Sequence, residues 1–363
     1  MKIALAHEYF VTRGGAERVM DALHAMWPDA PVYTFFHDRS RFGPLTGWTL
    51  RTSYLQLLLL GESHRLLLPL YPNAARGLRV GADVDVALVS TSAFIKGIGL
   101  AERTVEVAYC HSPTRYLWDW RERYLEEEVP APLRGVIGDL LIRLRETDRI
   151  AAARVDRWIA NSRAVAERIR RYYGSESDIV YPPIDVESFR CADERADFWI
   201  FVGRLSAYKR ADVAVRAFNE LGMRLLVVGE GRERAALERI ANENVVFTGR
   251  ADDETLRDLL ASARGLVFPA DDDFGLVCAE ALASGAPVVA LAAGGAPEIV
   301  RDGEEGALVD APQPRAFADG VLRVERSRHQ PKALRDSARR FDVSRFRERV
   351  RAIVGEAYAK GRA

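Results

Sequence analysis

The stretch FWIFVGRLSAYKRADVAVRAFNELGMRLLVVG, residues 198–229, has the pattern of a strand, a loop, a helix and a second strand. Its two apolar runs, at either end, are short and uninterrupted, which is typical of strands buried on both faces of a parallel sheet. The alternation continues with apolar runs at 244–249, 265–270 and 286–291, and with helices that begin near Lys209, Arg232, Asp253 and Phe274. The sequence therefore predicts a doubly wound parallel α/β domain over residues 198–343.

The first half of the chain shows the same alternation. Strand-like runs occupy residues 2–8, 31–36, 84–91, 105–112 and 157–162, and helical patterns cover 16–27 and 132–155. We expect a first Rossmann-like domain over residues 1–180, a linker over 181–197 and a final helix, 344–360, that is available to pack back on the first domain. Two such domains facing each other across a cleft would bind ligands beyond the carboxyl ends of their strands.

The composition excludes several classes of protein. The chain has 363 residues, of which 48% are hydrophobic and 29% charged, and this excludes a disordered or fibrous chain. Basic and acidic residues number 52 each, so no global field draws the chain to nucleic acid. The chain has three widely spaced cysteines, which fits a reducing compartment, and it shows neither a signal-peptide pattern nor a membrane-spanning run. We therefore expect a cytoplasmic protein. Only five of the basic residues are lysines, so a lysine inside a motif stands out.

Two cations follow the first strand of the second half. Arg204 and Lys209 are five residues apart, at the end of a strand and the start of the next helix. Arginine can bind two oxygens at once, and the free amides of a helix N-terminus add further donors. The pair therefore predicts a diphosphate clamp, with solvated surface charges as the alternative.

Carboxylates gather after a later strand of the same half. Asp271, Asp272 and Asp273 precede a predicted helix start, and Glu280 lies on that helix, where it could chelate a ribose diol. The backbone amides there could meet an anion or a sugar hydroxyl; they belong to Phe274, Gly275 and Leu276. The alternatives are helix capping by the aspartates, a solvent-facing Glu280, and a metal site on Asp271 and Asp273. We expect no metal, because Arg204 and Lys209 already supply positive charge.

Two features of the first half also fall at strand ends. Gly14 and Gly15 separate the first strand from the first helix, where amides could approach an anion, although the dinucleotide-binding glycine fingerprint is missing. His111 follows another strand and would point into the cleft. The alternatives are a tight turn for the glycines and a structural role for the histidine.

Leucines are concentrated between Leu55 and Leu70, which holds nine of them in sixteen residues. Arginines stand near this segment and along the helical pattern at 132–155. Apolar residues beside arginines suit a surface that dips into anionic lipid headgroups without spanning the bilayer. The alternative is that these leucines cover the first sheet.

Taken together, these motifs resemble the family-4 retaining glycosyltransferases, whose members have the GT-B fold. The resemblance covers nearly the whole chain and is closest to the bacterial GDP-mannose-dependent branch that builds O-antigens and exopolysaccharides. The segments that carry it are GGAERV, YCHSPTRY, ANSRAVAERIRRYYG, VYPPID, FVGRLSAYKR, FGLVCAEALASGAPVVA and GGAPEIV.

The resemblance implies roles for the residues of the second half. Arg204 and Lys209 match the family's diphosphate-binding pair, and Glu280 matches the glutamate that holds the donor ribose. Asp272 stands eight residues earlier, where the family usually has a glutamate that contacts the donor sugar. Aspartate is one methylene shorter, so its reach to the sugar hydroxyls is in question.

In the first half, His111 matches the family's histidine near the sugar C6 hydroxyl and the reacting centre. Gly14 and Gly15 match the loop that closes over donor phosphate and acceptor. For the GDP-mannose donor, Asp252 or Asp253 could accept from the N1–H and N2–H2 donors of guanine, a bidentate match that uracil cannot make. The alternative is an ordinary helix N-cap.

The resemblance implies a metal-independent, cofactor-free hexosyltransferase that retains configuration, with the leaving phosphate oxygen as base. The expected donor is GDP-mannose, and the expected acceptor is a glycan or a polyprenyl-diphosphate-linked oligosaccharide. The alternatives are a UDP-sugar-dependent member of the family, a sugar-nucleotide epimerase and an inactive nucleotide-sugar-binding scaffold. No nucleic-acid partner is expected.

Overall fold

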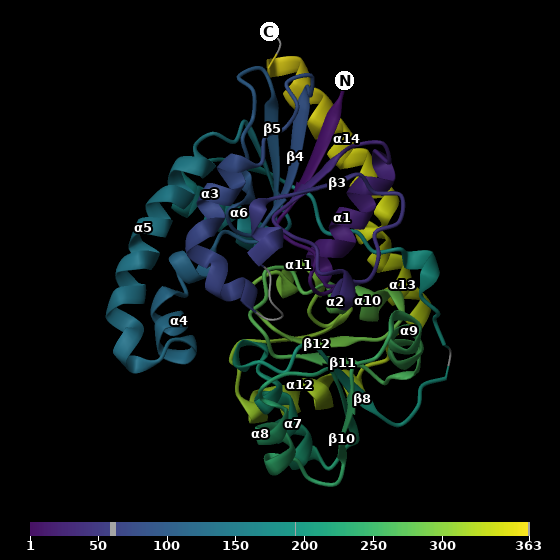
Figure 1. Cartoon of the computed structure of the whole chain (residues 1–363). Helices are drawn as coiled ribbons and strands as arrows, with labels where there is room; N and C mark the ends of the chain where they lie inside the picture. Colours follow the sequence, from purple (N-terminus) through teal and green to yellow (C-terminus); the bar gives the residue numbers. More distant parts are fainter. Residues whose placement is uncertain (59–62, 193, 362–363) are drawn as a thin grey trace. The chain divides into compact units, whose positions relative to one another are not determined.

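The computed structural model describes residues 1–58, 63–192 and 194–361. The chain divides into two compact units (Figure 1), which are considered separately. Unit 1 comprises Met1–Tyr181 together with Phe346–Ala363, and unit 2 comprises Pro182–Arg345. The segment predicted as a linker is thus grouped with unit 2.

Unit 1 is built on a parallel sheet of seven strands in the order β3-β2-β1-β4-β5-β6-β7. Its strands are β1 Ile3–His7, β2 Val32–Thr34, β3 Leu50–Thr52, β4 Val86–Thr91, β5 Val105–Cys110, β6 Arg157–Ala160 and β7 Ser177–Ile179. Its α-helices are α1 Gly15–Met26, α2 Arg39–Phe42, α3 Tyr71–Gly77, α4 Arg121–Glu128, α5 Arg134–Ala152 and α6 Arg163–Tyr173, and most of α14 Val343–Gly361 also belongs to it. Helices α3 and α5 cover the sheet face that carries Ala6 and Val89, and α14 reaches the other face, where the Phe346 ring lies 5.7 Å from that of Tyr109.

Unit 2 has a second parallel sheet of six strands in the order β10-β9-β8-β11-β12-β13. Its strands are β8 Trp199–Val202, β9 Leu225–Val228, β10 Val245–Gly249, β11 Leu266–Phe268, β12 Val288–Leu291 and β13 Gly306–Val309. Its helices are α7 Ala211–Leu221, α8 Arg234–Ile240, α9 Asp253–Ser262, α10 Leu276–Ala283, α11 Ala296–Ile299, α12 Pro314–Arg326 and α13 Pro331–Ala338. The apolar faces of α7 and α12 pack on β8, β9 and β12 in one core.

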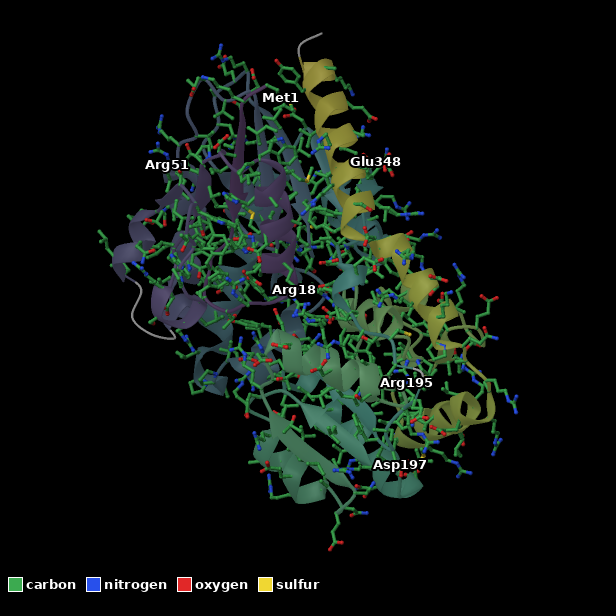
Figure 2. The ribbon with its side chains drawn as sticks, turned by 90° about the vertical axis from the view of Figure 1, so that its right-hand side faces the viewer. Met1, Arg18, Arg51, Arg195, Asp197 and Glu348 are labelled. Carbon is green, nitrogen blue, oxygen red and sulfur yellow. The ribbon has the colours of Figure 1, made fainter. Side chains whose placement is uncertain are left out.

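Arg195, labelled in Figure 2, connects the start of unit 2 to two of its helices through hydrogen bonds. Its guanidinium donates to the carbonyl oxygens of Leu260, Ala261 and Ala263 at the end of α9, and to that of Ser284 after α10. These are the carbonyls that a helix leaves without an intrahelical partner. The segment expected to be a plain linker therefore caps two helices of unit 2.

The leucine-rich segment divides between core and surface. Residues 59–62 lie outside the described part, as do the side chains of 63–66. Leu55 is fully buried, and Leu67 and Leu68 pack against the core of unit 1, whereas Leu57 is 86% exposed. The described residues contain no helix whose length and apolarity would let it cross a bilayer. The sheet-covering reading thus holds for part of the segment only.

Glu106, the second residue of β5, predicts a pH dependence of stability. Its carboxyl is buried, neither oxygen has a hydrogen-bond partner among the described residues, and burial raises its pKa to about 8. The folded chain therefore holds this proton up to about pH 8, whereas the unfolded chain releases it near pH 4.5. Stability is lost as the pH rises through this window, by up to about 1.4 kcal/mol per unit.

The Glu106→Gln variant keeps the shape of the side chain and cannot ionise. We expect the wild type to lose more melting temperature than this variant between about pH 5 and about pH 9. Equal losses in the two proteins would mean that Glu106 ionises in the folded chain without cost.

Candidate functional site

The loop after β8 holds the two predicted cations in different surroundings. Arg204 is exposed, and no described residue hydrogen-bonds or pairs with its guanidinium. Lys209 ends a short 3-10 turn, and Arg210 follows with φ +53°, a left-handed conformation that is uncommon outside glycine. This turn starts α7 directly behind Lys209.

Two glycines after β9 lie against the backbone of the loop that carries Arg204 and Lys209. A Cβ atom on Gly229 would lie 1.9 Å from the carbonyl oxygen of Gly203, and one on Gly231 would lie 2.1 Å from that of Leu205. The Leu205 amide donates to the Glu230 carbonyl at 2.9 Å. The Gly229–Gly231 turn is therefore a backbone-to-backbone support for the cationic loop, because no side chain would fit there.

Lys209 reaches across the sheet end to the loop after β11. Its Nζ lies 2.7 Å from Asp272 Oδ2, and it also lies 5.7 Å from the Phe268 ring centroid. Burial lowers the pKa of Lys209. Asp272 raises this pKa, Tyr208 and Asp273 raise it by smaller amounts, and together they outweigh the effect of burial, so the net shift is upward. The ammonium is therefore charged at neutral pH, and in the absence of an anion its counterion is Asp272.

The loop bearing Asp272 is closed by the glycine pair after β12. A Cβ on Gly294, at φ +60°, would lie 2.0 Å from the Asp272 carbonyl oxygen, and the Gly295 amide donates to that oxygen at 2.9 Å. The backbone of the GGAPEIV segment thus helps to fix the position of the loop that carries these carboxylates.

Helix α10 begins at Leu276, not at Phe274 as predicted. Gly275 takes φ +88° as the N-cap, a conformation that stops the helix from extending backward. Phe274 is buried and its ring lies 5.6 Å from that of Phe341. The alternative in which Asp271–Asp273 cap this helix is therefore wrong, since Gly275 holds that position without a side-chain cap.

Glu280 is buried, with 4% of its surface exposed, so the solvent-facing alternative is wrong. The Cys278 thiol lies near it on the same helix. Burial raises the pKa of this thiol well above its usual value, Asp272 and Glu280 raise it further, and Lys209 opposes them. These three charged side chains consequently share one neighbourhood around α10.

Asp252 is committed to helix α9. Its carboxylate accepts a hydrogen bond from the Thr255 amide at 2.8 Å, and hydrogen bonds from the Thr255 amide and side chain lower its pKa. The capping alternative is therefore confirmed for Asp252. Asp253, the first residue of α9, is exposed, and its contact with guanine stays a prediction.

In unit 1, Gly14 is the N-cap of α1 and Gly15 is its first residue. The Gly14 backbone is extended, so its conformation alone does not require glycine. A Cβ there would lie 3.1 Å from Glu17 Oε2, however, and would press on that carboxylate. Phosphate binding by these two residues stays a prediction.

His111 directly follows β5 and is held at three points. Its amide donates to the Thr91 carbonyl at 2.9 Å, its carbonyl accepts from Asn161 Nδ2 at 2.8 Å, and its Nε2 lies 2.8 Å from Ser90 Oγ. Burial, helped by nearby His7, lowers its pKa to about 3. The imidazole is therefore neutral at physiological pH and acts through hydrogen bonds.

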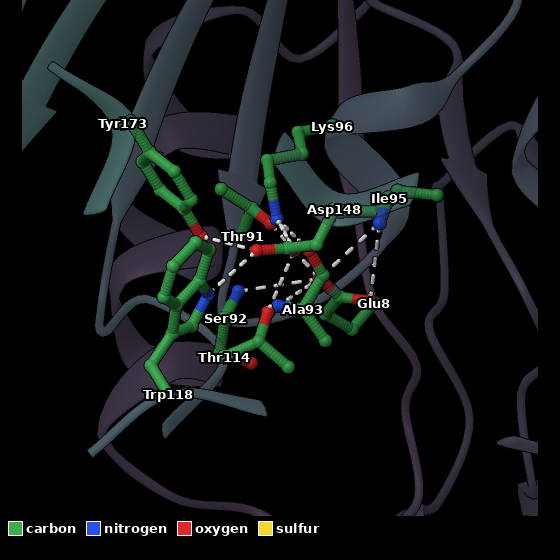
Figure 3. A network of polar contacts seen from close by, with 10 residues as sticks. All are labelled: Glu8, Thr91, Ser92, Ala93, Ile95, Lys96, Thr114, Trp118, Asp148 and Tyr173. Carbon is green, nitrogen blue, oxygen red and sulfur yellow. Dashed lines mark hydrogen bonds and ion pairs between the residues drawn. The ribbon is translucent and has the colours of Figure 1, made fainter. Parts of the chain in front are cut away.

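Unit 1 contains a buried polar network that the sequence did not predict (Figure 3). Lys96 and Asp148 form an ion pair of 2.5 Å with 2% and 0% of their side chains exposed. Asp148 also accepts hydrogen bonds from Thr114, Trp118 and Tyr173 at 2.9–3.0 Å. The scarcity of lysine, which pointed to Lys209, applies equally to Lys96.

Glu8 forms the second part of this network. Its carboxylate accepts from the Thr91 hydroxyl at 3.0 Å and from the amides of Ser92, Ala93 and Ile95 at 2.7–3.3 Å. Glu8 thus ties the end of β1 to the turn after β4. Together with Asp148, which holds Thr114, it fixes the segments that flank His111.

Within the described residues no three His, Cys, Asp or Glu side chains are grouped so as to hold a metal ion. Metal independence nevertheless stays a prediction. Unit 2 offers an exposed arginine, a charged lysine and two carboxylates around one sheet end. Such a set is suited to an anionic group and to hydroxyls beside it.

Residues 197–326 match the model of the family described as glycosyl transferases, group 1. The D-inositol 3-phosphate glycosyltransferase of Streptomyces scabiei is 33% identical over 228 residues, which cover 53% of this chain and 49% of that protein. The enzyme of the same name from Acidothermus cellulolyticus is 34% identical over 233 residues, or 55% and 50%. This chain thus spans about half the length of the curated relatives it matches.

Solved structures resemble the whole chain. The crystal structure of Anabaena HepE in complex with UDP has a TM-score of 0.72 at 18% identity and covers 98% of this chain and 100% of that one. Sucrose-phosphate synthase from Thermosynechococcus elongatus has a TM-score of 0.76 at 18% identity, with coverages of 99% and 100%. The predicted fold class, GT-B with two parallel Rossmann-like sheets, is confirmed.

Proposed function

We propose that the protein is a group 1 glycosyltransferase that transfers a hexose from a nucleoside-diphosphate sugar to a hydroxyl group of an acceptor. The observation that carries this proposal is the Lys209–Asp272 pair, which lies within the stretch matching that family. In this pair a cation suited to a diphosphate lies beside a carboxylate suited to sugar hydroxyls, which supports the proposal.

The proposed steps use the chain's own groups. Lys209 and Arg204 bind the diphosphate and stabilise the charge that grows on it as the glycosidic bond breaks. Asp272 then exchanges its ion pair with Lys209 for hydrogen bonds to the sugar, while Glu280 holds the ribose. The acceptor hydroxyl gives its proton to the leaving phosphate oxygen, and the configuration is retained without a metal.

The donor proposed is GDP-mannose, with Asp253 at the guanine. A UDP-sugar is the second candidate, because a structure of similar fold was solved with UDP-glucose. The acceptor proposed is a glycan or a polyprenyl-diphosphate-linked oligosaccharide. The names of the relatives make D-inositol 3-phosphate the acceptor to test beside it.

A thermal-shift panel of GDP, UDP, ADP, GDP-mannose and UDP-glucose tests the donor. A ligand at 100 times its Kd adds about 2.7 kcal/mol to stability, so the base that is recognised gives the largest rise in melting temperature. No rise with any nucleoside diphosphate would end the proposal.

Acceptor-dependent release of nucleoside diphosphate then separates transfer from the alternatives. An epimerase would change the donor without an acceptor, and a scaffold would bind it without turnover. We expect full turnover in excess chelator. A strict need for a divalent cation would instead favour a metal role for Asp271 and Asp273.

We further propose a cytoplasmic location with contact to an anionic membrane surface through unit 1. Exposed apolar residues support this contact, among them Leu57 and, on α5, Val136 and Ile150. The same helix carries the exposed Arg143 and Arg149. Arg134 and Arg145 support it less, since one hydrogen-bonds backbone carbonyls and the other stacks on Trp118. Co-sedimentation with anionic liposomes that fades at high salt is expected, and no binding to any liposome would refute the contact.

A further inference from the structure

Four side chains of unit 1 form a continuous chain that ends at His111. Ser90 Oγ lies 2.8 Å from His111 Nε2 and 3.0 Å from His7 Nδ1, and His7 Nε2 lies 3.5 Å from Glu17 Oε1. His7 ends β1, Ser90 lies in β4, Glu17 lies in α1 and His111 directly follows β5. These residues can meet because β1, β4 and β5 are adjacent in the sheet. The strand register pairs His7 directly with Ser90.

The hydrogen-bonding capacity of these groups gives the chain a direction. An ionised carboxylate only accepts, so the proton of neutral His7 lies on Nε2, facing Glu17, and its Nδ1 is an acceptor. Ser90 has one proton, which it therefore donates to His7 Nδ1. The Ser90 oxygen then accepts from His111 Nε2–H.

His111 Nδ1 is left as the unprotonated nitrogen. No described residue hydrogen-bonds to it, so it is available to accept from a hydroxyl group. His7 and Ser90 are buried, with 2% and 0% of their surfaces exposed, so water does not compete for their hydrogen bonds.

We propose that Glu17, His7 and Ser90 are positioning residues that determine which ring nitrogen of His111 carries its proton, so that Nδ1 accepts a hydrogen bond from a substrate hydroxyl. The substrate part of this inference rests on the proposed function. The tautomer part does not.

The ionisable groups facing His7 are Glu17 and Asp21 on α1 and His111 beyond Ser90, while Arg13 is paired with Asp21 at 3.3 Å. Burial lowers the pKa of His111 to about 3, so its ring holds a single proton at neutral pH, and its hydrogen bond with Ser90 determines which nitrogen carries that proton.

The test is 15N NMR of the full chain with labelled histidine and no ligand, with the His111 signals identified by their loss in His111→Ala. Near neutral pH we expect an N–H at Nε2 and a bare Nδ1. The reverse arrangement, with the N–H at Nδ1 and a bare Nε2, or an equal mixture of the two tautomers, would overturn the proposal.

Ser90→Ala removes the link, so the preference of His111 for a proton on Nε2 should be lost, whereas Ser90→Thr keeps the hydroxyl and should retain that preference. An unchanged Nε2–H tautomer of His111 in a folded Ser90→Ala would refute the chain. Should Ser90→Ala fail to fold, Glu17→Gln is the second variant. Glutamine can donate or accept, so His7 and His111 should each become a mixture of tautomers, and a single unchanged tautomer would refute the chain.

Turnover gives an independent readout. We expect Ser90→Ala to lower kcat about tenfold with unchanged donor affinity and an altered pH profile, and Ser90→Thr to restore much of it. Equal turnover in wild type and a folded Ser90→Ala would refute the positioning role. A wild type that shows the Nε2–H tautomer of His111 but transfers no sugar would refute the proposed function and leave the chain standing.

Discussion

Replacing Lys209 by alanine is expected to lower turnover about 100-fold or more, because a donor positioned at the charge that grows in the transition state contributes about 2.7–4 kcal/mol, and to lower the affinity for a nucleoside diphosphate. The ammonium is 16% exposed and lies 2.7 Å from Asp272. It is therefore already held in place and loses little freedom when an anion replaces the carboxylate. Calorimetric titration with GDP and UDP measures the loss.

The matched control is Lys332→Ala, which removes an exposed lysine of α13 in the same unit. It should change neither affinity nor melting temperature. If the Lys209–Asp272 pair serves stability alone, Lys209→Ala would lower the melting temperature and leave the affinity of GDP and UDP as it was. That pattern would remove Lys209 from the binding site.

Asp272→Asn separates the two partners further. Lys209 would lose its counterion and become freer to bind a diphosphate, so the affinity for GDP or UDP should stay the same or rise. Turnover of the sugar donor should fall, because the amide is a weaker acceptor for the sugar hydroxyls. If the affinity for GDP or UDP and the turnover fall together, Asp272 acts only by positioning Lys209.

The sequence predicts the buried strands well and the edge strands poorly. β4, β5 and β12 are buried throughout and mostly apolar, although β4 ends in Ser90 and Thr91 and β5 carries Glu106. β3 and β7 are edge strands of three residues with partly exposed side chains, and they have no apolar run to reveal them. β13 is not predicted because it is short and begins at a glycine, a residue that is depleted in strands. The structure requires glycine there, since a Cβ on Gly306 would lie 1.9 Å from the Val288 carbonyl oxygen.

The candidate site was predictable only where one loop carries it. Arg204 and Lys209 are neighbours in sequence, and their spacing at a strand end indicates a shared role. The partners of Lys209 and of His111 come from segments 63 and 21 residues away, respectively. Only the strand order places them together, so pairs such as Lys209–Asp272 and Ser90–His111 required the structure.

The buried pair of Lys96 and Asp148 carries the largest expected effect on stability. Lys96→Met removes the cation and leaves the Asp148 carboxylate in the core with Thr114, Trp118 and Tyr173 as its hydrogen-bond donors. Breaking a buried ion pair at one partner costs about 3–5 kcal/mol, which is a large part of the roughly 5–15 kcal/mol that stabilises a domain. We expect the melting temperature to fall by about 10 °C.

The double variant Lys96→Met with Asp148→Asn distinguishes the cause. An amide at position 148 is neutral, so it tolerates the loss of the lysine while it still accepts from Trp118 or Tyr173 and can donate to Thr114. The double variant should therefore be more stable than Lys96→Met alone, although Lys96 and Asp148 are both altered in it. If the double variant is less stable than both Lys96→Met and Asp148→Asn, the lost energy comes from packing and hydrogen bonds around Asp148, and not from an uncompensated charge.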